Sequence, residues 1–226
     1  MAIFFITGID TGIGKTWATG MAARYLHRQG KKVITQKLVQ TGQCSGISED
    51  ILEHRRLTGI LPLPEDSPLP RYPNGSLTCP YSFAYPASPH FAAGLEKCTI
   101  EPEQITLFTE RLHHQFDTLL LEGAGGFLTP LTSSLLTADY IEQRGYPVVL
   151  VTSGRLGSIN HTLLTLEAVH RRNLFLACLV FNQYPLDDEG ICTDSFRFFH
   201  RICPHVVIMP GIDSQRIPDV DFSCLL

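Results

Sequence analysis

The sequence lacks the features that a membrane protein or a nucleic-acid-binding protein needs. Its longest apolar run, residues 174–181, is eight residues long, and no basic region precedes the apolar N-terminus, so we expect neither a membrane span nor a signal peptide. Eighteen basic residues against twenty-two acidic ones give no field that would hold nucleic acid or an anionic membrane. The expected partner is therefore a small molecule.

The motifs of several enzyme and metal-site classes are also missing. None of the seven cysteines forms a C-x-x-C pair, and several stand among apolar residues, as Cys178 does in LFLACLVF; this usage is typical of a reduced, cytoplasmic chain. The histidines lack zinc-site spacing, and no G-x-S-x-G motif supplies a hydrolase nucleophile. The 226 residues show no repeat, and we interpret residues 1–226 as a single domain with a core of its own; the alternative is two small domains.

What the sequence does contain, near its start, is a strand, a glycine-rich turn and a helix. Residues 3–6 have the composition of a strand buried on both faces, and apolar residues recur at helical spacing over residues 17–26. Between them, Gly14-Lys15-Thr16 ends a turn that offers phosphates free N–H groups, a helix dipole, an ammonium and a hydroxyl for Mg²⁺. Five residues separate Gly8 from Gly14, one more than in the standard phosphate loop, and Gly12 makes that length tolerable. The turn predicts a nucleotide phosphate site; the alternative is an ordinary turn with a surface lysine.

Strands and helices alternate along the rest of the chain. This alternation predicts an α/β fold of the phosphate-loop type, with a mostly parallel sheet and helices on both faces. The region from about residue 59 to 90 is different, because residues 61–89 hold eight of the fifteen prolines, and we expect a long irregular connection of the kind that forms lids or binding loops. Further buried strands are expected at residues 33–35, 118–121, 147–151, 176–181 and 206–209.

Charged residues stand at the ends of two predicted strands. Lys37 follows the second strand and Glu122 ends the one at residues 118–121. Because the carboxyl ends of parallel strands line the ligand crevice, we expect Lys37 to point where Lys15 points, and Glu122 to be the second metal-side acid of a nucleotide site. The alternatives are a solvated lysine and a strand-ending acid before a flexible turn. Asp50, in the first turn of a helix, fits either a metal ligand or a capping acid.

Three other polar residues stand near predicted strand ends or helix starts. His90 is either a ligand-facing imidazole or a satisfied helix-start histidine, and we favour the second. Ser158 can cap the helix that it opens, and plain capping is the default interpretation; the alternative is that the free amides there form a second anion site suited to a carboxylate. Asn182 brings both a donor and an acceptor to the crevice edge.

Taken together, these motifs resemble the ATP-dependent dethiobiotin synthetase family of biotin synthesis. They cover nearly the whole chain, and the five-residue gap in the phosphate loop is similar to that family's. The resemblance implies an ATP- and Mg²⁺-dependent ligase. It would carboxylate 7,8-diaminononanoate with CO₂ and close the ureido ring through a carbamate and its carbamic-phosphoric anhydride, releasing ADP and phosphate. The motifs, in the family's order, are GIDTGIGKT, QKLVQTG around Lys37, Ser88-Pro89-His90, Glu122-Gly123-Ala124-Gly125-Gly126, LGSINH from Leu156, and Asn182.

The resemblance also implies residue roles. Lys15 and Lys37 would be catalytic, neutralising the γ-phosphate and the carbamate, and Thr16, Asp50 and Glu122 would hold Mg²⁺. Nucleotide contacts would come from Gly12, Ile13, Gly14, Lys15, Thr16, Trp17, Asp50, Glu122, Gly123, Ala124, Gly125, Asn182, Pro210, Gly211 and Ile212. Substrate contacts would come from Thr41 near the reacting amines and from Gly157, Ser158, Ile159 and Asn160, which in the family bind the distant carboxylate from the partner subunit of a homodimer.

The chain departs from the family pattern at a few positions. Thr41 stands where serine is common, Leu38 where proline is common, and Gly12 where an acidic residue is frequent, while the spacing from Lys37 to Asp50 is shorter than usual. Two other classes of function stay open. The first is another phosphate-loop protein, such as an amidotransferase-type ligase domain or a partitioning-type ATPase, which would be expected to show a basic surface for DNA. The second is a nucleotide-binding protein without turnover, which would have no need of two lysines and a metal-side acid.

Overall fold

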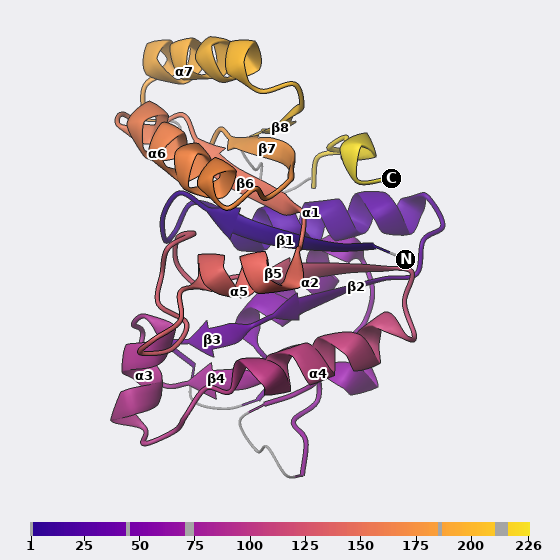
Figure 1. Cartoon of the computed structure of the whole chain (residues 1–226). Coiled ribbons are helices and arrows are strands. Elements are labelled where there is room, and N and C mark those ends of the chain that lie inside the picture. Colours follow the sequence, from indigo (N-terminus) through magenta and orange to yellow (C-terminus); the bar gives the residue numbers. More distant parts are fainter. Residues whose placement is uncertain (1, 44–45, 71–74, 185–186, 211–216) are drawn as a thin grey trace.

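The computed structural model describes residues 2–43, 46–70, 75–184, 187–210 and 217–226. At its centre lies a six-stranded sheet with the order β2-β5-β1-β6-β7-β8 (Figure 1). Every pair of neighbouring strands in it is parallel, so the predicted fold class is confirmed. The strands are β1 (Ala2–Gly8), β2 (Val33–Lys37), β5 (Thr118–Glu122), β6 (Val148–Ser153), β7 (Leu176–Asn182) and β8 (Val206–Met209).

Successive side chains of a strand point to opposite faces of the sheet, and a hydrophobic core covers each face. Phe5 of β1 packs into one hydrophobic core and Ile6 into the other. The core on the Ile6 side is closed by α1 (Lys15–Arg28), by Leu57 of α2 (Glu49–Thr58) and by the C-terminal residues. The other core is covered by α3 (Pro89–Leu95), α4 (Pro102–His113), α5 (Thr137–Arg144), α6 (Ser158–Arg171) and α7 (Glu189–Ile202) (Figure 1). In the described part of the chain no helix has the length and apolar character needed to cross a membrane.

The proline-rich connection is more ordered than its composition predicts. It contains a 3₁₀ turn, η1 (Pro64–Asp66), and a short strand, β4 (Tyr81–Phe83), that pairs in parallel with β3 (Val39–Thr41) as a separate two-stranded sheet. The expectation of a wholly irregular connection was therefore wrong at both places. Backbone pairing with β3, which begins two residues after Lys37, keeps this segment close to the strand ends.

The helix α7 was not expected from the sequence. It begins at Glu189, directly after its N-cap Asp188, whose side chain accepts a hydrogen bond from the Ile191 N–H. One side of α7, carrying Cys192, Ser195 and Phe199, is buried. With this side α7 covers the outer part of the sheet, where Phe199 packs against Phe181 of β7.

Candidate active site

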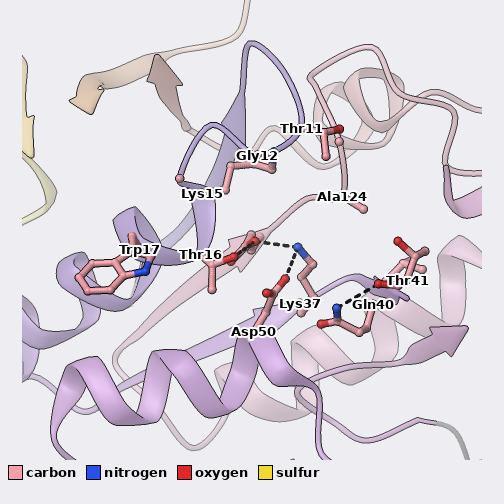
Figure 2. Close-up of a pocket in the computed structure, with 14 residues that line it drawn as sticks. Thr11, Gly12, Lys15, Thr16, Trp17, Lys37, Gln40, Thr41, Asp50 and Ala124 are labelled. Carbon is pink, nitrogen blue, oxygen red and sulfur yellow. Dashed lines mark hydrogen bonds and ion pairs between the residues drawn. The ribbon is translucent and has the colours of Figure 1, made fainter. Parts of the chain in front are cut away.

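A cavity of about 360 Å³ lies at the carboxyl ends of β1, β2 and β5 (Figure 2). The phosphate loop forms one side of it, and residues that follow β2 and β5 form the other. As predicted, Lys15 and Lys37 reach the same cavity from different strand ends. The predicted residues that line it are Gly12, Gly14, Lys15, Thr16, Trp17, Lys37, Thr41, Asp50, Glu122, Ala124 and Gly125; Thr11, Val39 and Gln40 also line it and were not predicted.

The phosphate loop is shaped by glycine and held by an asparagine from another strand. Gly14, the N-cap of α1, has φ 97°, a conformation that side chains disfavour. A Cβ atom there would lie 2.4 Å from the Asn182 Nδ2 atom. That amide donates a 3.0 Å hydrogen bond to the Ile13 carbonyl, so Asn182 supports the loop from the end of β7. The first amides of α1 are thereby fixed toward the cavity as an anion site.

Lys37, the last residue of β2, is buried between two carboxylates. Its Nζ atom lies 2.7 Å from Asp50 Oδ2 and 2.7 Å from Glu122 Oε1, and it also donates to the Gly123 carbonyl at 3.2 Å. Figure 2 shows the Lys37 ammonium directed at Asp50, with a dashed line joining the two side chains. Burial opposes the charge, but the Glu122 and Asp50 carboxylates outweigh it and hold the pKa of Lys37 above its usual value. Lys37 is therefore a permanent cation at this site.

Glu122 is fully buried and has a partner on each carboxylate oxygen. Its Oε1 atom accepts a hydrogen bond from the Thr16 hydroxyl at 3.1 Å, in addition to the contact with Lys37. Its Oε2 atom lies 2.8 Å from His54 Nε2. Burial opposes ionisation, but Lys37 and His54 together hold the pKa of Glu122 well below its usual range. The acid is ionised and aimed at the phosphate loop.

The residues around Thr16 have the chemistry of a magnesium site. Thr16, Asp50 and Glu122 contribute one hydroxyl and two carboxylates to the same cavity, and oxygen donors suit a hard cation. No cluster of three or more His, Cys, Asp or Glu residues that could hold a metal occurs in the described part of the chain. A nucleotide-bound Mg²⁺ does not need one, because water and phosphate oxygens complete its octahedron. The donor set fits Mg²⁺ carried in with a nucleotide.

Lys15 is the more weakly basic of the two site lysines. Its Nζ atom donates a 2.8 Å hydrogen bond to the Asp10 carbonyl, within the phosphate loop. Burial, with a smaller contribution from the Lys37 ammonium, lowers the pKa of Lys15 to about 8. A bound phosphate would restore the charge, since an anion favours the protonated amine.

A pH dependence of nucleotide binding follows from this low pKa. Below pH 8 Lys15 is charged and meets the phosphates directly; above pH 8 it must first take up a proton, so we expect ADP affinity to fall by up to about tenfold per pH unit. The emission of Trp17, the one tryptophan of the chain, which lines the cavity, reports binding. In Lys15→Arg the guanidinium stays protonated, and the slope above pH 8 should disappear. A wild-type affinity that is constant from about pH 7.5 to 9.5 would contradict the assignment.

Sequence reasoning missed an ion pair that connects the phosphate loop to the β6–α6 loop. Arg155 Nη2 lies 2.5 Å from Asp10 Oδ2, while Asp10 Oδ1 accepts a hydrogen bond from the Thr11 N–H at 2.7 Å. Both side chains are partly exposed. The contact joins the segment before α6 to the loop that faces the phosphates.

The residues predicted to bind the distant carboxylate lie elsewhere in this chain. Gly157, Ile159 and Asn160 line a separate cavity of about 610 Å³ between α6 and α7. Ser158 was expected as a helix cap, but the N-cap is Gly157, with φ 88° and no side-chain bond. The Ser158 side chain is buried and bonds instead to the Ser153 hydroxyl at 2.9 Å, so the capping prediction was wrong. Within one chain these residues do not meet the phosphate cavity.

The remaining predicted residues fall into three groups. Ile13 contributes its side chain to the core and its carbonyl to Asn182, and Gly123 offers its carbonyl to Lys37. Pro210 follows β8 and is half-buried; Gly211 and Ile212 lie outside the described residues. His90 is at the start of α3, where its Nδ1 atom is 3.1 Å from the Ser88 hydroxyl, in agreement with the favoured interpretation.

His54 is the main site-adjacent residue that sequence reasoning missed. It stands four residues after Asp50 on α2, and residues at that spacing share one face of a helix. That spacing was a usable signal once Asp50 had been placed at the cavity. The burial of both His54 and its neighbour Arg55 was not visible in the sequence, because α2 also carries charged residues on its exposed side.

A parallel sheet with a phosphate loop between β1 and α1 and a buried acid at the end of β5 defines a phosphate-loop nucleotide-binding protein. A family model described as an AAA domain matches residues 3–210, and curated relatives narrow the class. The ATP-dependent dethiobiotin synthetase BioD 2 of Pasteurella multocida (strain Pm70) is 49% identical over 199 residues, 88% of this chain and 90% of that protein. The dethiobiotin synthetase of Chlorobaculum tepidum is 49% identical over 193 residues, covering 85% and 77%. The chain belongs to the ATP-dependent dethiobiotin synthetase family.

Solved structures agree with the fold. A putative plasmid partition protein from Borrelia burgdorferi, bound to AMPPNP, gives a TM-score of 0.53 at 12% identity, with 95% of this chain and 88% of that one covered. The signal recognition particle receptor FtsY of Elizabethkingia anophelis gives 0.51 at 13% identity, with 95% and 60% covered. At these identities the likeness concerns the fold alone.

Proposed function

We propose that this chain catalyses the reaction that the dethiobiotin synthetase name describes. It would convert 7,8-diaminononanoate, CO₂ and ATP into dethiobiotin, ADP and phosphate. One observation carries the proposal: Lys37, from a strand end away from the phosphate loop, lies 2.7 Å from each of two carboxylates in the cavity that Thr16 and Lys15 also line. Such a site brings fixed cations to a place where a second anion can meet a triphosphate.

The chemistry needs positive charge more than it needs acid–base groups. One amine of the substrate takes up CO₂ and loses a proton, giving a carbamate anion, and a carbamate oxygen then attacks the γ-phosphorus while ADP leaves. Two anions must approach each other in this step, and the ammonium groups of Lys15 and Lys37 lower that barrier. The second amine then attacks the carbamate carbon, phosphate leaves, and the ureido ring is closed.

The metal and the nucleotide would be held by groups on both sides of the cavity. Thr16, Asp50 and Glu122 would bind Mg²⁺, which supplies charge neutralisation between the β- and γ-phosphates when bound. Lys37, which lies between Asp50 and Glu122, would supply the positive charge that faces the carbamate. The adenine contacts would come from Asn182, Pro210, Gly211 and Ile212, and the substrate amines would lie near Thr41.

A homodimer would complete the substrate site. Gly157, Ser158, Ile159 and Asn160 do not line the phosphate cavity of their own chain. Leu156 and Leu163, which line the separate cavity beside α6, are 82% and 41% exposed. Exposed apolar residues that lie together are typical of an interface. In the proposal these residues bind the distant carboxylate of a substrate held by the partner subunit.

The domain organisation and the compartment belong to the same proposal: residues 1–226 work as one ligase domain, in the cytoplasm.

The test is a phosphate-release assay with and without the diamine and bicarbonate, together with mass analysis of the product. We expect ATP turnover to require both additions, and the product to have the mass of the diamine plus CO₂ less one water. Phosphate release that is indifferent to the diamine would contradict the proposal and favour a nucleotide-switched ATPase. Binding of ATP with no turnover under any of these conditions would favour a binding protein.

A further inference from the structure

A buried chain of hydrogen bonds runs from α2 to the acid at the end of β5. Arg55 Nη1 donates to the Thr35 hydroxyl at 2.9 Å, that hydroxyl lies 3.0 Å from His54 Nδ1, and His54 Nε2 lies 2.8 Å from Glu122 Oε2. Thr35, His54 and Glu122 have no exposed surface, and Arg55 is 2% exposed. His54 lines no part of the phosphate cavity, so it reaches the site through Glu122.

One arrangement of protons satisfies all the hydrogen bonds between Arg55, Thr35, His54 and Glu122. The ionised Glu122 carboxylate can only accept, so the proton of the imidazole is on Nε2. With Nε2 protonated, Nδ1 is free to accept the Thr35 hydroxyl proton, and the Thr35 oxygen accepts from Arg55. Every polar atom then has a partner of the opposite role with a neutral imidazole. These hydrogen bonds can therefore orient Glu122 without any of the four side chains gaining or losing a proton.

The consequence for Glu122 is a fixed rotation of its carboxylate. His54 engages Oε2, which leaves Oε1 facing Thr16 and Lys37. If the donor on Oε2 were lost, a buried carboxylate oxygen would be left without its partner. The group would then turn to recover a donor, and Oε1 would leave the position from which it faces Thr16.

We propose that His54 is a positioning residue that orients Glu122 for the magnesium–nucleotide complex. The proposal rests on the proposed magnesium site, and it adds the group that sets the geometry of that site. Two residues of α2 would then serve the site. Asp50, in the first turn, lines the cavity, and His54, one turn later, contacts Glu122. Changes to groups that orient metal ligands commonly cost 10–100-fold in metal affinity.

Two amide replacements separate the two sides of the imidazole. In His54→Gln the side-chain amide takes a position close to that of Nε2 and can still donate to Glu122. In His54→Asn the shorter amide comes close to the Nδ1 position, keeps Thr35 within reach and leaves Glu122 without its donor. His54→Leu removes both bonds. A residue needed only for the packing of α2 would tolerate the Asn and Gln variants equally.

The measurement is the tightening of ADP binding by Mg²⁺, followed by Trp17 emission, with thermal unfolding as a second readout. We expect His54→Gln to keep the Mg²⁺-dependent tightening within about threefold of wild type, and His54→Asn and His54→Leu to lose about tenfold or more, with little change in Mg²⁺-free ADP affinity. The proposal would be overturned if Mg²⁺ increased the ADP affinity of the Asn and Gln variants equally. It would also be overturned if Mg²⁺ did not change the ADP affinity of the wild type. The measurement uses ADP and Mg²⁺ without the diamine, so it tests the role of His54 even if the chain does not catalyse the synthetase reaction.

A measurement on the unmodified protein covers the case in which the Asn and Leu variants do not fold. With ¹⁵N-labelled histidine, the resonance assigned to His54 through the His54→Gln spectrum should show a neutral ring protonated at Nε2. It should also shift when Mg²⁺ and ADP are added together, and shift less with ADP alone. A ring protonated at Nδ1, or a resonance that ignores Mg²⁺–ADP, would refute the positioning role.

Discussion

Lys37→Ala is expected to lower the turnover of the synthetase reaction by about 10²–10³-fold, the usual cost of removing one fixed group that stabilises transition-state charge. Nucleotide affinity should change little, because the ammonium lies between Asp50 and Glu122 and the phosphate loop supplies the main phosphate contacts. At saturating Mg²⁺ the two carboxylates left behind keep their counter-ion. Turnover is measured with product detection, and affinity with Trp17 emission.

Lys31→Ala is the matched control for this variant, since Lys31 is an exposed lysine ahead of the same strand. It should leave both turnover and affinity at wild-type values. Equal losses of turnover and nucleotide affinity in Lys37→Ala would show that Lys37 binds the nucleotide and does not act on the carbamate. Retention of most turnover would remove Lys37 from the mechanism.

Asp66→Ala is expected to lower the free energy of unfolding by about 3–5 kcal/mol, the typical cost of leaving a buried charge without its partner. Asp66 is fully buried and receives two hydrogen bonds from Arg55, at 2.9 and 2.7 Å. Thr78 and the Leu63 N–H also donate to it, each at 2.8 Å. The loss should appear in denaturant unfolding as a lower midpoint.

The double variant Arg55→Met/Asp66→Leu tests the cause of that loss. Because both charges are removed together, most of the stability should return. Glu167→Ala breaks the exposed pair with Arg171 on α6 and should change stability by less than about 1 kcal/mol. If Asp66→Ala costs no more than Glu167→Ala, the buried pair does not hold α2 in place.

The sequence predicted the central sheet well because its strands have a strong local signal. Residues 119–121 and 176–181 are continuous apolar runs, and each lies in a strand that is paired on both sides. The phosphate loop was also predictable, since glycine, lysine and threonine stand at the spacing that a phosphate needs. Local composition was enough at these positions.

Prediction from the sequence failed where the structure depends on distant partners. The strands β3 and β4 are three residues long, too short for a periodic signal, and each exists because the other pairs with it. Asp66 lies in the proline-rich segment, and nothing near it in the chain indicates that it meets Arg55. Asn182 was expected at the crevice edge, but its bond to Ile13 depends on how β7 lies relative to the phosphate loop.

The position of β1 in the sheet has a consequence for how the protein is made. Although β1 is synthesised before both of its neighbours in the sheet, it pairs with Thr118–Glu122 on one side and with residues 148–151 on the other. An emerging chain therefore holds an apolar strand without either sheet neighbour until residues 118–122 have left the ribosome, and such long-range pairing is slow. Nucleotide binding should consequently appear only after β5 and β6 have been synthesised, and chaperone contact with the unpaired β1 segment should end once β6 is available.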